Sequence, residues 1–439
     1  MIPSSPVDLD ALRAELRTVS PARATGRVRG VTGLSIRAVL PGARIGDVVT
    51  VERRGGPLLG EVVGFDEGSV VVMPLGETTG VGTDDLVEST GAPLQVRVGE
   101  GLLGRVLDGL GRPLDGGPAP RGEPLPVDRA PIPALARTLV EAPLATGIRA
   151  IDGLLTLGVG QRVGLFAGSG VGKSTIIGAL AQNAAADVVV VALVGERGRE
   201  AKELIEHALA PARARTVVVV ATSDAPAVER LRAAQVATTV AESFRDEGKR
   251  VLLLVDSITR VARAQREVGL SAGEPPARRG YPPSVFAMLP RLLERSGPGK
   301  VGSITAIYAV LVEGDDLDEP VTDEVRGILD GHIVLSRSLA QRHHYPAIDV
   351  AASVSRTMPR VVSAPHLAAA STVRALIALA DEKRDLVALG AYRAGSDAAV
   401  DRALAAEGDV RRFLVQPPGE APSLEATVQA LERLAARYG

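Results

Sequence analysis

Nearly continuous apolar runs alternate with stretches of helical periodicity through the middle of the chain. The apolar runs predict strands at residues 162–166, 188–194, 216–221, 251–255 and 303–311, and the intervening stretches predict helices at residues 174–184, 199–209, 226–246 and 284–295. Apolar strands that alternate with helices are typical of a mostly parallel sheet that is buried on both faces. The pattern therefore predicts an α/β domain over residues 138–362.

The pattern before this domain has a shorter period. Short β-branched runs are separated by Gly, Pro and Asp turns, and they lie at residues 26–28, 34–36, 47–51, 60–65, 69–73 and 94–98. Such spacing is typical of a small β-barrel, which we expect over residues 21–98. Residues 99–137 are rich in proline and glycine, and we expect them to form an extended linker that wraps onto the core.

Helical periodicity is found at both ends of the chain. Leu9, Leu12 and Leu16 share one face of the segment 4–19, which predicts an amphipathic helix within residues 1–20. Such a helix either docks a partner or packs locally, and the pattern leaves both readings open. Residues 363–439 are rich in Ala, Leu and charged residues at helical spacing, and they predict a C-terminal helical domain.

The composition narrows the classes of function. The 439 residues carry a net charge of −2 and no cysteine, so disulfides and thiolate metal sites are excluded and a reducing compartment is expected. An aromatic content of 2% and the absence of a basic excess argue against nucleic acid as a partner. No signal-peptide pattern is found, and the apolar runs are too short to span a bilayer. We therefore expect a soluble protein whose membrane association is at most peripheral.

The clearest chemical signal is the glycine-rich stretch after the strand predicted at residues 162–166. It consists of Gly168, Ser169, Gly170, Val171, Gly172, Lys173, Ser174 and Thr175. A strand, such a loop and a helix in this order bind nucleoside triphosphates, because backbone N–H groups surround the phosphates. Lys173 is expected at the β- and γ-phosphates and Ser174 on Mg²⁺. The strict pattern has Gly where this chain has Ala167. A turn that binds nothing is disfavoured, because both flanking elements fit.

Charged residues follow the strand predicted at residues 188–194. Glu196 comes directly after it, at the edge where open α/β sheets bind ligands, and is the candidate to orient and activate the attacking water. Arg197 is a candidate for contact with the γ-phosphate, and Glu200 for holding a water bound to Mg²⁺. The alternative is the solvated start of a helix, which stays open above all for Glu200.

A second acid ends the strand predicted at residues 251–255. Asp256 is expected on the Mg²⁺ side of the phosphates, and the alternative is a helix N-cap. Arg260 follows one turn later and is a candidate either to reach the phosphates or to brace Glu196.

Three weaker candidates lie further along the chain. Arg356 stands in a Ser-rich turn, where an arginine is usually structural, but an arginine donated across a subunit interface stabilises the charge of phosphoryl transfer. Tyr345 is a candidate platform for the adenine ring, and its alternative is a tyrosine that packs the loop. Phe413 is a similar but weaker candidate.

With these residues the chain resembles the family of rotary and hexameric ATPases that includes the F-type ATPase α and β subunits. More narrowly it is similar to the export ATPases of flagella and type III secretion. The resemblance covers roughly residues 25–415, and it rests on residues 164–175, 195–200, 273–286, 313–316, 330–337 and 344–349. Ala167 is normal within this group. Residues 390–397 favour the flagellar branch over the injectisome branch.

The resemblance implies a RecA-like P-loop core with an N-terminal β-barrel and a C-terminal helical domain, assembled as a homohexamer that binds ATP and Mg²⁺ between subunits. Arg356 of a neighbour would complete each site. Residues 269–283 would face the central pore, where a stalk protein binds. ATP hydrolysis would help to release and unfold export substrates and their chaperones at the export gate, under a stator-like negative regulator bound to the N-terminal helix. The implied location is the cytoplasmic face of the inner membrane, at the flagellar basal body.

Other ring ATPases remain as alternatives. One is an injectisome ATPase, and another is a catalytic subunit of an F- or V-type synthase. Synthase rings divide the catalytic acid and the arginine finger between two chains, whereas this chain has both Glu196 and Arg356. An RNA-translocating termination helicase would need RNA-binding aromatic residues in the barrel, where Phe65 is the only aromatic residue. A non-catalytic ring subunit would usually lack the acid at position 196.

Overall fold

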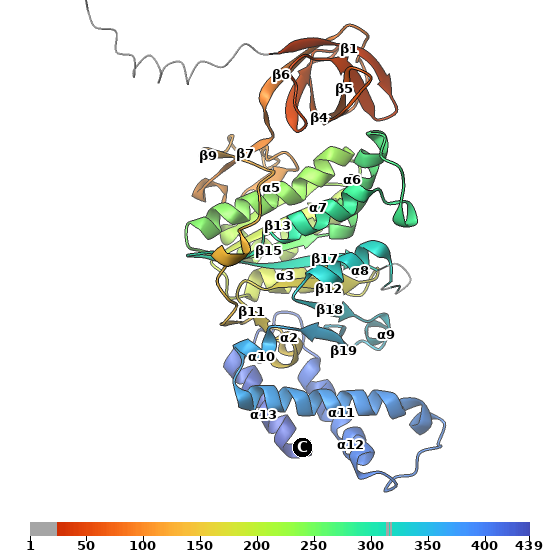
Figure 1. The fold of residues 1–439 in the computed structure, drawn as a ribbon. Helices are drawn as coiled ribbons and strands as arrows, with labels where there is room; N and C mark the ends of the chain where they lie inside the picture. Colours follow the sequence, from red (N-terminus) through yellow and green to blue (C-terminus); the bar gives the residue numbers. More distant parts are fainter. Residues whose placement is uncertain (1–23, 313–315, 317) are drawn as a thin grey trace, which may run out of the picture. The chain divides into compact units, whose positions relative to one another are not determined.

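The computed structural model describes residues 24–312, 316 and 318–439. It divides into two compact units, one ending at Leu94 and the other running from Gln95 to Gly439 (Figure 1). The helix predicted within residues 1–20 and residues 313–315 of the segment 313–316 lie outside the described residues.

The first unit is a closed antiparallel barrel with the strand order β1-β2-β5-β4-β3-β6. The strands are β1 (Thr25–Thr32), β2 (Ser35–Val39), β3 (Asp47–Val51), β4 (Leu58–Asp66), β5 (Ser69–Pro74) and β6 (Leu86–Pro93). Alternate residues point inwards, so that Ile36, Val49, Val62 and Val72 are fully buried. The predicted β-barrel is therefore present.

One predicted strand was assigned to the wrong sheet. Residues 94–98 were expected in the barrel, but β7 (Gln95–Val98) pairs with β9 (Glu123–Pro126) in the second unit. The sixth barrel strand is β6, whose sequence Leu-Val-Glu-Ser-Thr-Gly-Ala-Pro lacks a continuous apolar alternation. The cleaner alternation of β7 made it the more strand-like candidate, although pairing, which is a tertiary property, decides the sheet.

The second unit is built on one large sheet with the order β19-β18-β12-β17-β15-β13-β14-β8, and a short strand, β16, pairs with β17. The strands are β8 (Val106–Asp108), β12 (Arg162–Ala167), β13 (Val188–Val194), β14 (Thr216–Ala221), β15 (Arg250–Asp256), β16 (Gly297–Pro298), β17 (Ser303–Leu311), β18 (Gly331–Leu335) and β19 (Ile348–Ser355). The pairings between β8 and β18 along this order are parallel, while β19 runs antiparallel to β18. Part of the expected linker thus joins the sheet as β8.

Helices cover both faces of this sheet. They are α3 (Lys173–Asn183), α4 (Gly198–Glu203), α5 (Ala227–Asp246), α6 (Ile258–Ser271) and α7 (Pro283–Leu293). Figure 1 shows α5, α6 and α7 together above the sheet. The single helix predicted at residues 199–209 is wrong: α4 passes into a π-helix at Leu204–Ala208, which closes with a Leu209 N–H to Leu204 carbonyl hydrogen bond of 2.8 Å. The wider turn accompanies the complete burial of Leu209.

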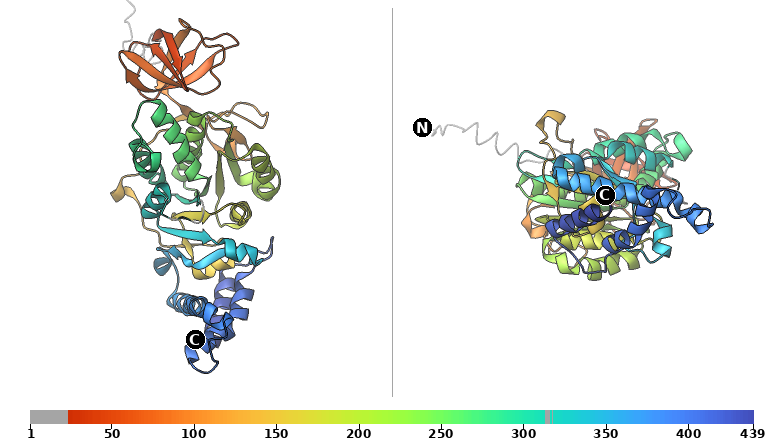
Figure 2. Two further views of the ribbon diagram at one scale, coloured as in Figure 1. Left: turned by 90° about the vertical axis from the view of Figure 1, so that its right-hand side faces the viewer. Right: turned by 90° about the horizontal axis from the view of Figure 1, so that it is seen from below.

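The chain ends in the predicted helices α11 (Ala364–Ala388), α12 (Ala398–Leu414) and α13 (Leu424–Tyr438), preceded by the short α10 (Met358–Val361). Side chains of Ser363, Asp397 and Ser423 accept backbone N–H hydrogen bonds at the helix starts, as N-caps do. Figure 2 shows these helices packed around each other. Among the described residues, no helix is long and apolar enough to cross a membrane.

Within the second unit, a buried ion pair joins α5 to the segment around Val127. The Arg295 guanidinium donates to both carboxylate oxygens of Glu242 at 2.9 Å, and it also donates to Thr239 and to the carbonyl of Val127. Arg295 and Glu242 are each 2% exposed. Because both charges are removed from water, Arg295 depends on Glu242 for compensation, and Glu242 depends on Arg295 and on the partly exposed Arg129 at 3.1 Å.

We expect Arg295→Ala to destabilise the second unit by about 3–5 kcal/mol, because Glu242 would lose its main buried counter-charge. Arg250→Ala is the control, since it removes an exposed pair with Asp187 whose loss costs at most about 1 kcal/mol. Urea denaturation followed by circular dichroism measures both. Equal midpoints for the two variants would contradict a structural role for the buried pair.

Candidate active site

The glycine-rich loop joins β12 to α3 at the carboxyl edge of the sheet. Gly170 and Gly172 have φ values of 77° and 93°, which side chains rarely tolerate, and Gly172 is the residue before α3. The loop therefore turns its backbone N–H groups and the start of α3 towards the same space. This is the geometry that binds phosphate groups.

Three charged side chains meet beside this loop. The Lys173 ammonium lies 3.2 Å from Glu196 Oε1 and also pairs with Asp256 Oδ1. These side chains are at most 12% exposed. Neighbouring parallel strands bring the two acids together, because Leu193 of β13 pairs with Asp256 of β15. One cation thus compensates two carboxylates in a partly dry site.

The same cluster includes Arg260. Its Nε lies 3.7 Å from Glu196 Oε1, the geometry expected if Arg260 braces the acid. Gly195 makes room for it, since a Cβ at Gly195 would lie 2.6 Å from Arg260 Cδ. Within the described part of the chain, Arg260 Nε and the buried Ser257 Oγ have no hydrogen-bond partner. The cluster therefore retains polar groups for further oxygen atoms.

A cavity of about 740 Å³ adjoins the loop. Of the predicted residues, Val171, Gly172, Ser174, Thr175, Glu200 and Tyr345 line it. Arg197 is not among its lining residues; its side chain is 77% exposed and pairs with Glu200 at 3.0 Å. Arg197 thus fits the alternative, a solvated residue at the start of a helix, and is not directed at the phosphate-binding loop.

The Tyr345 ring lies at the mouth of this cavity. A Cβ at Gly172 would be 3.8 Å from the ring, and Tyr345 is 42% exposed, so one side of it is available for stacking. The Tyr345 carbonyl accepts a hydrogen bond of 2.9 Å from the Gln416 N–H. Gln416 also donates to the Gly147 carbonyl at 2.7 Å and accepts from the Arg149 N–H at 2.9 Å. Gln416 thereby fixes the cavity wall.

Sequence reasoning missed much of this wall. The cavity is also lined by residues on the loop after α12, namely Gln416, Pro417, Pro418, Gly419 and Glu420. The Pro-Pro-Gly sequence signals a turn, but nothing local to it indicates that the turn lies beside a loop more than 240 residues earlier.

Gly147, another lining residue, is held by the buried Asp152 of α2 (Arg149–Leu154). The Asp152 carboxylate accepts hydrogen bonds from the N–H groups of Thr146 and Gly147, both at 2.9 Å, and from the Thr146 hydroxyl at 2.7 Å. Burial raises the pKa of Asp152 to about 6, although these three hydrogen bonds oppose the shift. The carboxylate therefore orders the turn at the rim of the cavity.

The structure does not bring Phe413 to the cavity. Its side chain is 8% exposed and packs against Gly153, where an added Cβ would lie 2.9 Å from the ring. Only its carbonyl is near the site wall, accepting from Arg149 Nε at 2.8 Å. The expected contact with adenine is wrong within one chain, because the apolar ring fills the core between α2 and the C-terminal helices.

Arg356 lies where the parallel strands begin, at the other end of the sheet from its own P-loop. Antiparallel pairing puts Ile348 of β19 beside Leu335, level with Ala167, and puts Ser355 beside Gly331 at the far end of β18. The ladder from Leu335 to Gly331 covers four residue steps of β18, roughly 13 Å, while β19 bulges between Asp349 and Val354. Arg356 follows Ser355 and is exposed. One chain therefore cannot bring Arg356 to its own phosphate site.

The oxygen donors near the loop suit Mg²⁺. Ser174 and Asp256 offer a hydroxyl and a carboxylate, and Mg²⁺ prefers one or two such ligands together with phosphate oxygens and water. Among the described residues, no cluster of three or more His, Cys, Asp or Glu side chains could hold a metal alone. The donor set therefore fits a metal that is bound jointly with a nucleotide.

Comparisons with known proteins agree with this geometry. Residues 147–355 match the model of the ATP synthase alpha/beta family nucleotide-binding domain, residues 28–91 match the beta-barrel domain of that family, and residues 362–433 match the T3SS EscN ATPase C-terminal domain. The chain is 49% identical to the Type 3 secretion system ATPase of Xanthomonas euvesicatoria, over 98% of both chains. It is 48% identical to the Flagellum-specific ATP synthase of Bacillus subtilis, over 93% of this chain and 94% of that protein.

Solved structures extend the similarity to three dimensions. The assembled ATPase EscN from the enteropathogenic E. coli type III secretion system is 45% identical, with a TM-score of 0.89 over 93% of this chain and 100% of that chain. EscN in complex with its central stalk EscO matches with a TM-score of 0.87 over the same shares.

Tyr345→Ala is expected to raise the Kd for ATP about 5- to 150-fold, because stacking of a base on an aromatic ring contributes about 1–3 kcal/mol. Tyr345→Phe keeps the ring and should bind ATP as the parent chain does. Calorimetric titration with a slowly hydrolysed ATP analogue measures both constants. Unchanged affinity in Tyr345→Ala would mean that the ring only packs the loop.

Proposed function

The chain belongs to the ATP synthase α/β family, among the ATPases of type III secretion and flagellar export, and on this premise we propose that it hydrolyses ATP as a homohexamer whose active sites are shared between neighbouring subunits. That it is an ATP-hydrolysing export enzyme follows from the family. The ring of six and the roles of individual residues are the proposal.

The positions of the two ends of β19 are the main support for a site shared between subunits. Tyr345 precedes this strand at its P-loop end, and Arg356 follows it at the other end, exposed and beyond a ladder of roughly 13 Å. An exposed arginine at that distance is useful to phosphoryl transfer only in another subunit's site. A head-to-tail ring gives every P-loop such a neighbour.

Lys173 is proposed to change partners when ATP binds. Its ammonium, which pairs with Glu196 and Asp256, would contact the β- and γ-phosphates instead. Glu196, still held by Arg260, is then free to accept a proton from the water that attacks the γ-phosphorus while the bond to the ADP oxygen breaks. Arg356 of the neighbour offsets the negative charge that develops on the transferring group.

Ser174 and Asp256 are proposed to hold Mg²⁺, and Glu200 a water bound to it. When bound, the ion neutralises charge on the β- and γ-phosphate oxygens. Glu200 lines the cavity, its side chain is 39% exposed, and it pairs with the solvated Arg197. The remaining loop residues, Gly168 to Gly170, are proposed to bind phosphate through their N–H groups.

We place the chain in the flagellar branch, on the strength of residues 390–397 in the loop between α11 and α12. That loop is well defined: the Tyr392 hydroxyl donates to Asp401 at 2.9 Å, and the Gly395 N–H donates to the same carboxylate at 2.8 Å. An injectisome ATPase is the second candidate, because relatives of both kinds match over nearly the whole chain. An F- or V-type synthase subunit is less favoured, since Glu196 and Arg356 stand on one chain.

The proposed partners follow from the same family. By analogy with EscN and its central stalk EscO, residues 269–283 are proposed to face a stalk protein in the pore. Arg266, just before this segment, stacks on Tyr281 within it, and Arg278 of the segment stacks on Phe286 just beyond it. A stator-like negative regulator is proposed at residues 1–20, and the export gate, substrates and chaperones are proposed clients at the cytoplasmic face of the inner membrane.

Mixing two inactive variants tests the shared site. Arg356→Ala keeps the water-activating acid, and Glu196→Gln keeps the finger, so each alone is expected to bind ATP and hydrolyse almost none. In rings mixed at equal amounts, about one quarter of the interfaces would pair an intact acid with an intact finger, and about a quarter of the parent ATPase rate should return.

The matched control is the double variant Arg356→Ala/Glu196→Gln mixed with Arg356→Ala, a mixture in which no finger exists. This mixture should remain inactive. If the first mixture co-assembles by native mass measurement and still gives no activity, Arg356 does not act across the interface. Full activity of Arg356→Ala alone would contradict its role as well.

A further inference from the structure

Two leucines are fully or largely exposed on a short segment that precedes the P-loop domain. We name residues 131–140 the leucine arm; it contains a single 3₁₀ turn at Ala134–Ala136. Leu135 is completely exposed, and Leu139 is 72% exposed. Single exposed leucines are ordinary, but two on one protruding segment point to an interaction surface. In Figure 1 the leucine arm is the yellow-orange segment at the left of the second unit.

The leucine arm is held in place rather than free. Arg137 donates from Nε to the Ile132 carbonyl at 3.2 Å and from Nη1 to the Ser296 carbonyl at 3.0 Å. The Thr138 hydroxyl donates to the Gly299 carbonyl at 3.2 Å. Pro131 and Pro133 restrict the backbone further. A side chain that is fixed before contact loses little entropy on binding, so the exposed leucines are preorganised for a partner.

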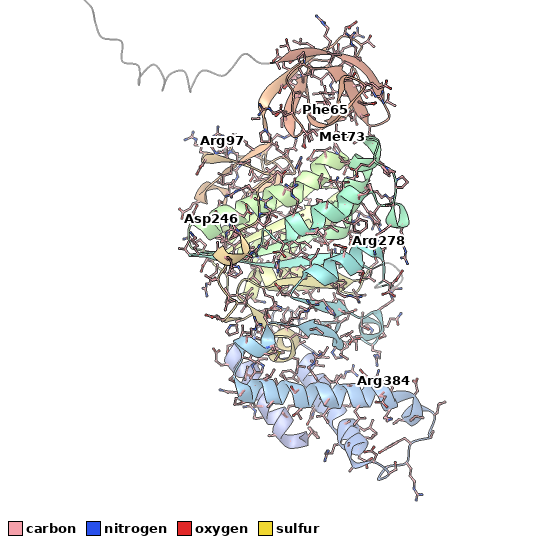
Figure 3. All side chains as sticks on the ribbon, in the orientation of Figure 1. Phe65, Met73, Arg97, Asp246, Arg278 and Arg384 are labelled. Carbon is pink, nitrogen blue, oxygen red and sulfur yellow. The ribbon has the colours of Figure 1, made fainter. Side chains whose placement is uncertain are left out.

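The C-terminal end of the leucine arm lies near Thr357, the residue after Arg356. Val140 packs on Gly158, and the Thr357 hydroxyl would be 3.4 Å from a Cβ at the same glycine. Val301, 71% exposed, sits on the turn that begins at Gly299, the partner of Thr138. All of these residues belong to the sheet edge opposite the P-loop, which in Figure 3 is the side where Asp246 is labelled, across from Arg278.

We propose that the leucine arm is the apolar anchor of the contact between subunits, with Leu135 and Leu139 covered by a second copy of this chain next to the P-loop that receives Arg356. The proposal rests on the shared-site function above. The occupant is a second copy because the arm ends next to Thr357, so a neighbour that accepts Arg356 approaches the end of the sheet from which the arm extends. Apolar side chains at the centre with an arginine nearby are also the usual composition of a stable interface.

The natural absence of cysteine allows a direct test in the full chain. Leu135→Cys carries an environment-sensitive fluorophore, and its emission is followed as the protein concentration rises in the presence of a slowly hydrolysed ATP analogue. Native mass measurement follows assembly in parallel. The emission should shift to the blue in step with assembly. Leu389→Cys is the matched control, because Leu389 is 80% exposed at the end of α11, and its emission should not shift.

A second variant measures the energetic role. Leu135→Asp/Leu139→Asp should leave the monomer folded, because both positions are exposed, and should raise the protein concentration needed for half-assembly at least tenfold. Leu389→Asp should not change it, and Arg356→Ala should assemble as the parent chain does.

The outcomes separate this proposal from the shared-site function. If rings form and mixed rings are active, but the label at position 135 stays in water, the leucine arm is not the anchor and the shared site stands. If the label is already shielded in the monomer, its own chain covers the arm and the proposal is wrong. If no multi-subunit species forms at any concentration, both proposals fail, and the mass measurement identifies that case.

Discussion

The position of the Lys173 ammonium between Glu196 and Asp256 is the constraint on which the site depends. Two carboxylates at the ends of neighbouring strands would repel each other in a partly dry site, and the Lys173 ammonium, with Arg260 beside Glu196, offsets this repulsion. The positive φ angles of Gly170 and Gly172 allow the loop to turn so that α3 begins at Lys173. In the proposed mechanism, a phosphate that attracts this lysine also releases both acids, so one side chain would couple nucleotide binding to activation.

The parallel core could be predicted from the sequence because its strands are apolar at nearly every position. A strand such as Val188–Val194, buried along its full length, has one physical interpretation. The residues at its end, including Glu196, follow from that assignment, because parallel strands collect their carboxyl ends at one edge. Lys173, Glu196 and Asp256 were therefore within reach of sequence reasoning.

Features that depend on long-range packing could not be predicted from the sequence. Phe413 looks like a base-stacking candidate in the sequence, yet its ring is drawn into the core by Gly153, which has no side chain to exclude it. Gln416 was missed because three of its hydrogen bonds join segments far apart in the chain. Strand β6 was overlooked and β7 placed in the wrong sheet, since the choice of partner strand is not encoded in alternation alone.

The strand β19 has one end at the base platform of its own site and the other beside the arginine offered to the next. β19 pairs with β18 at Ile348, Asp349, Val354 and Ser355 and bulges in between, so both of its ends are fixed to the same short strand. In the proposed ring, a strand fixed in this way would carry a tilt of the sheet at one site to the arginine of the adjacent one.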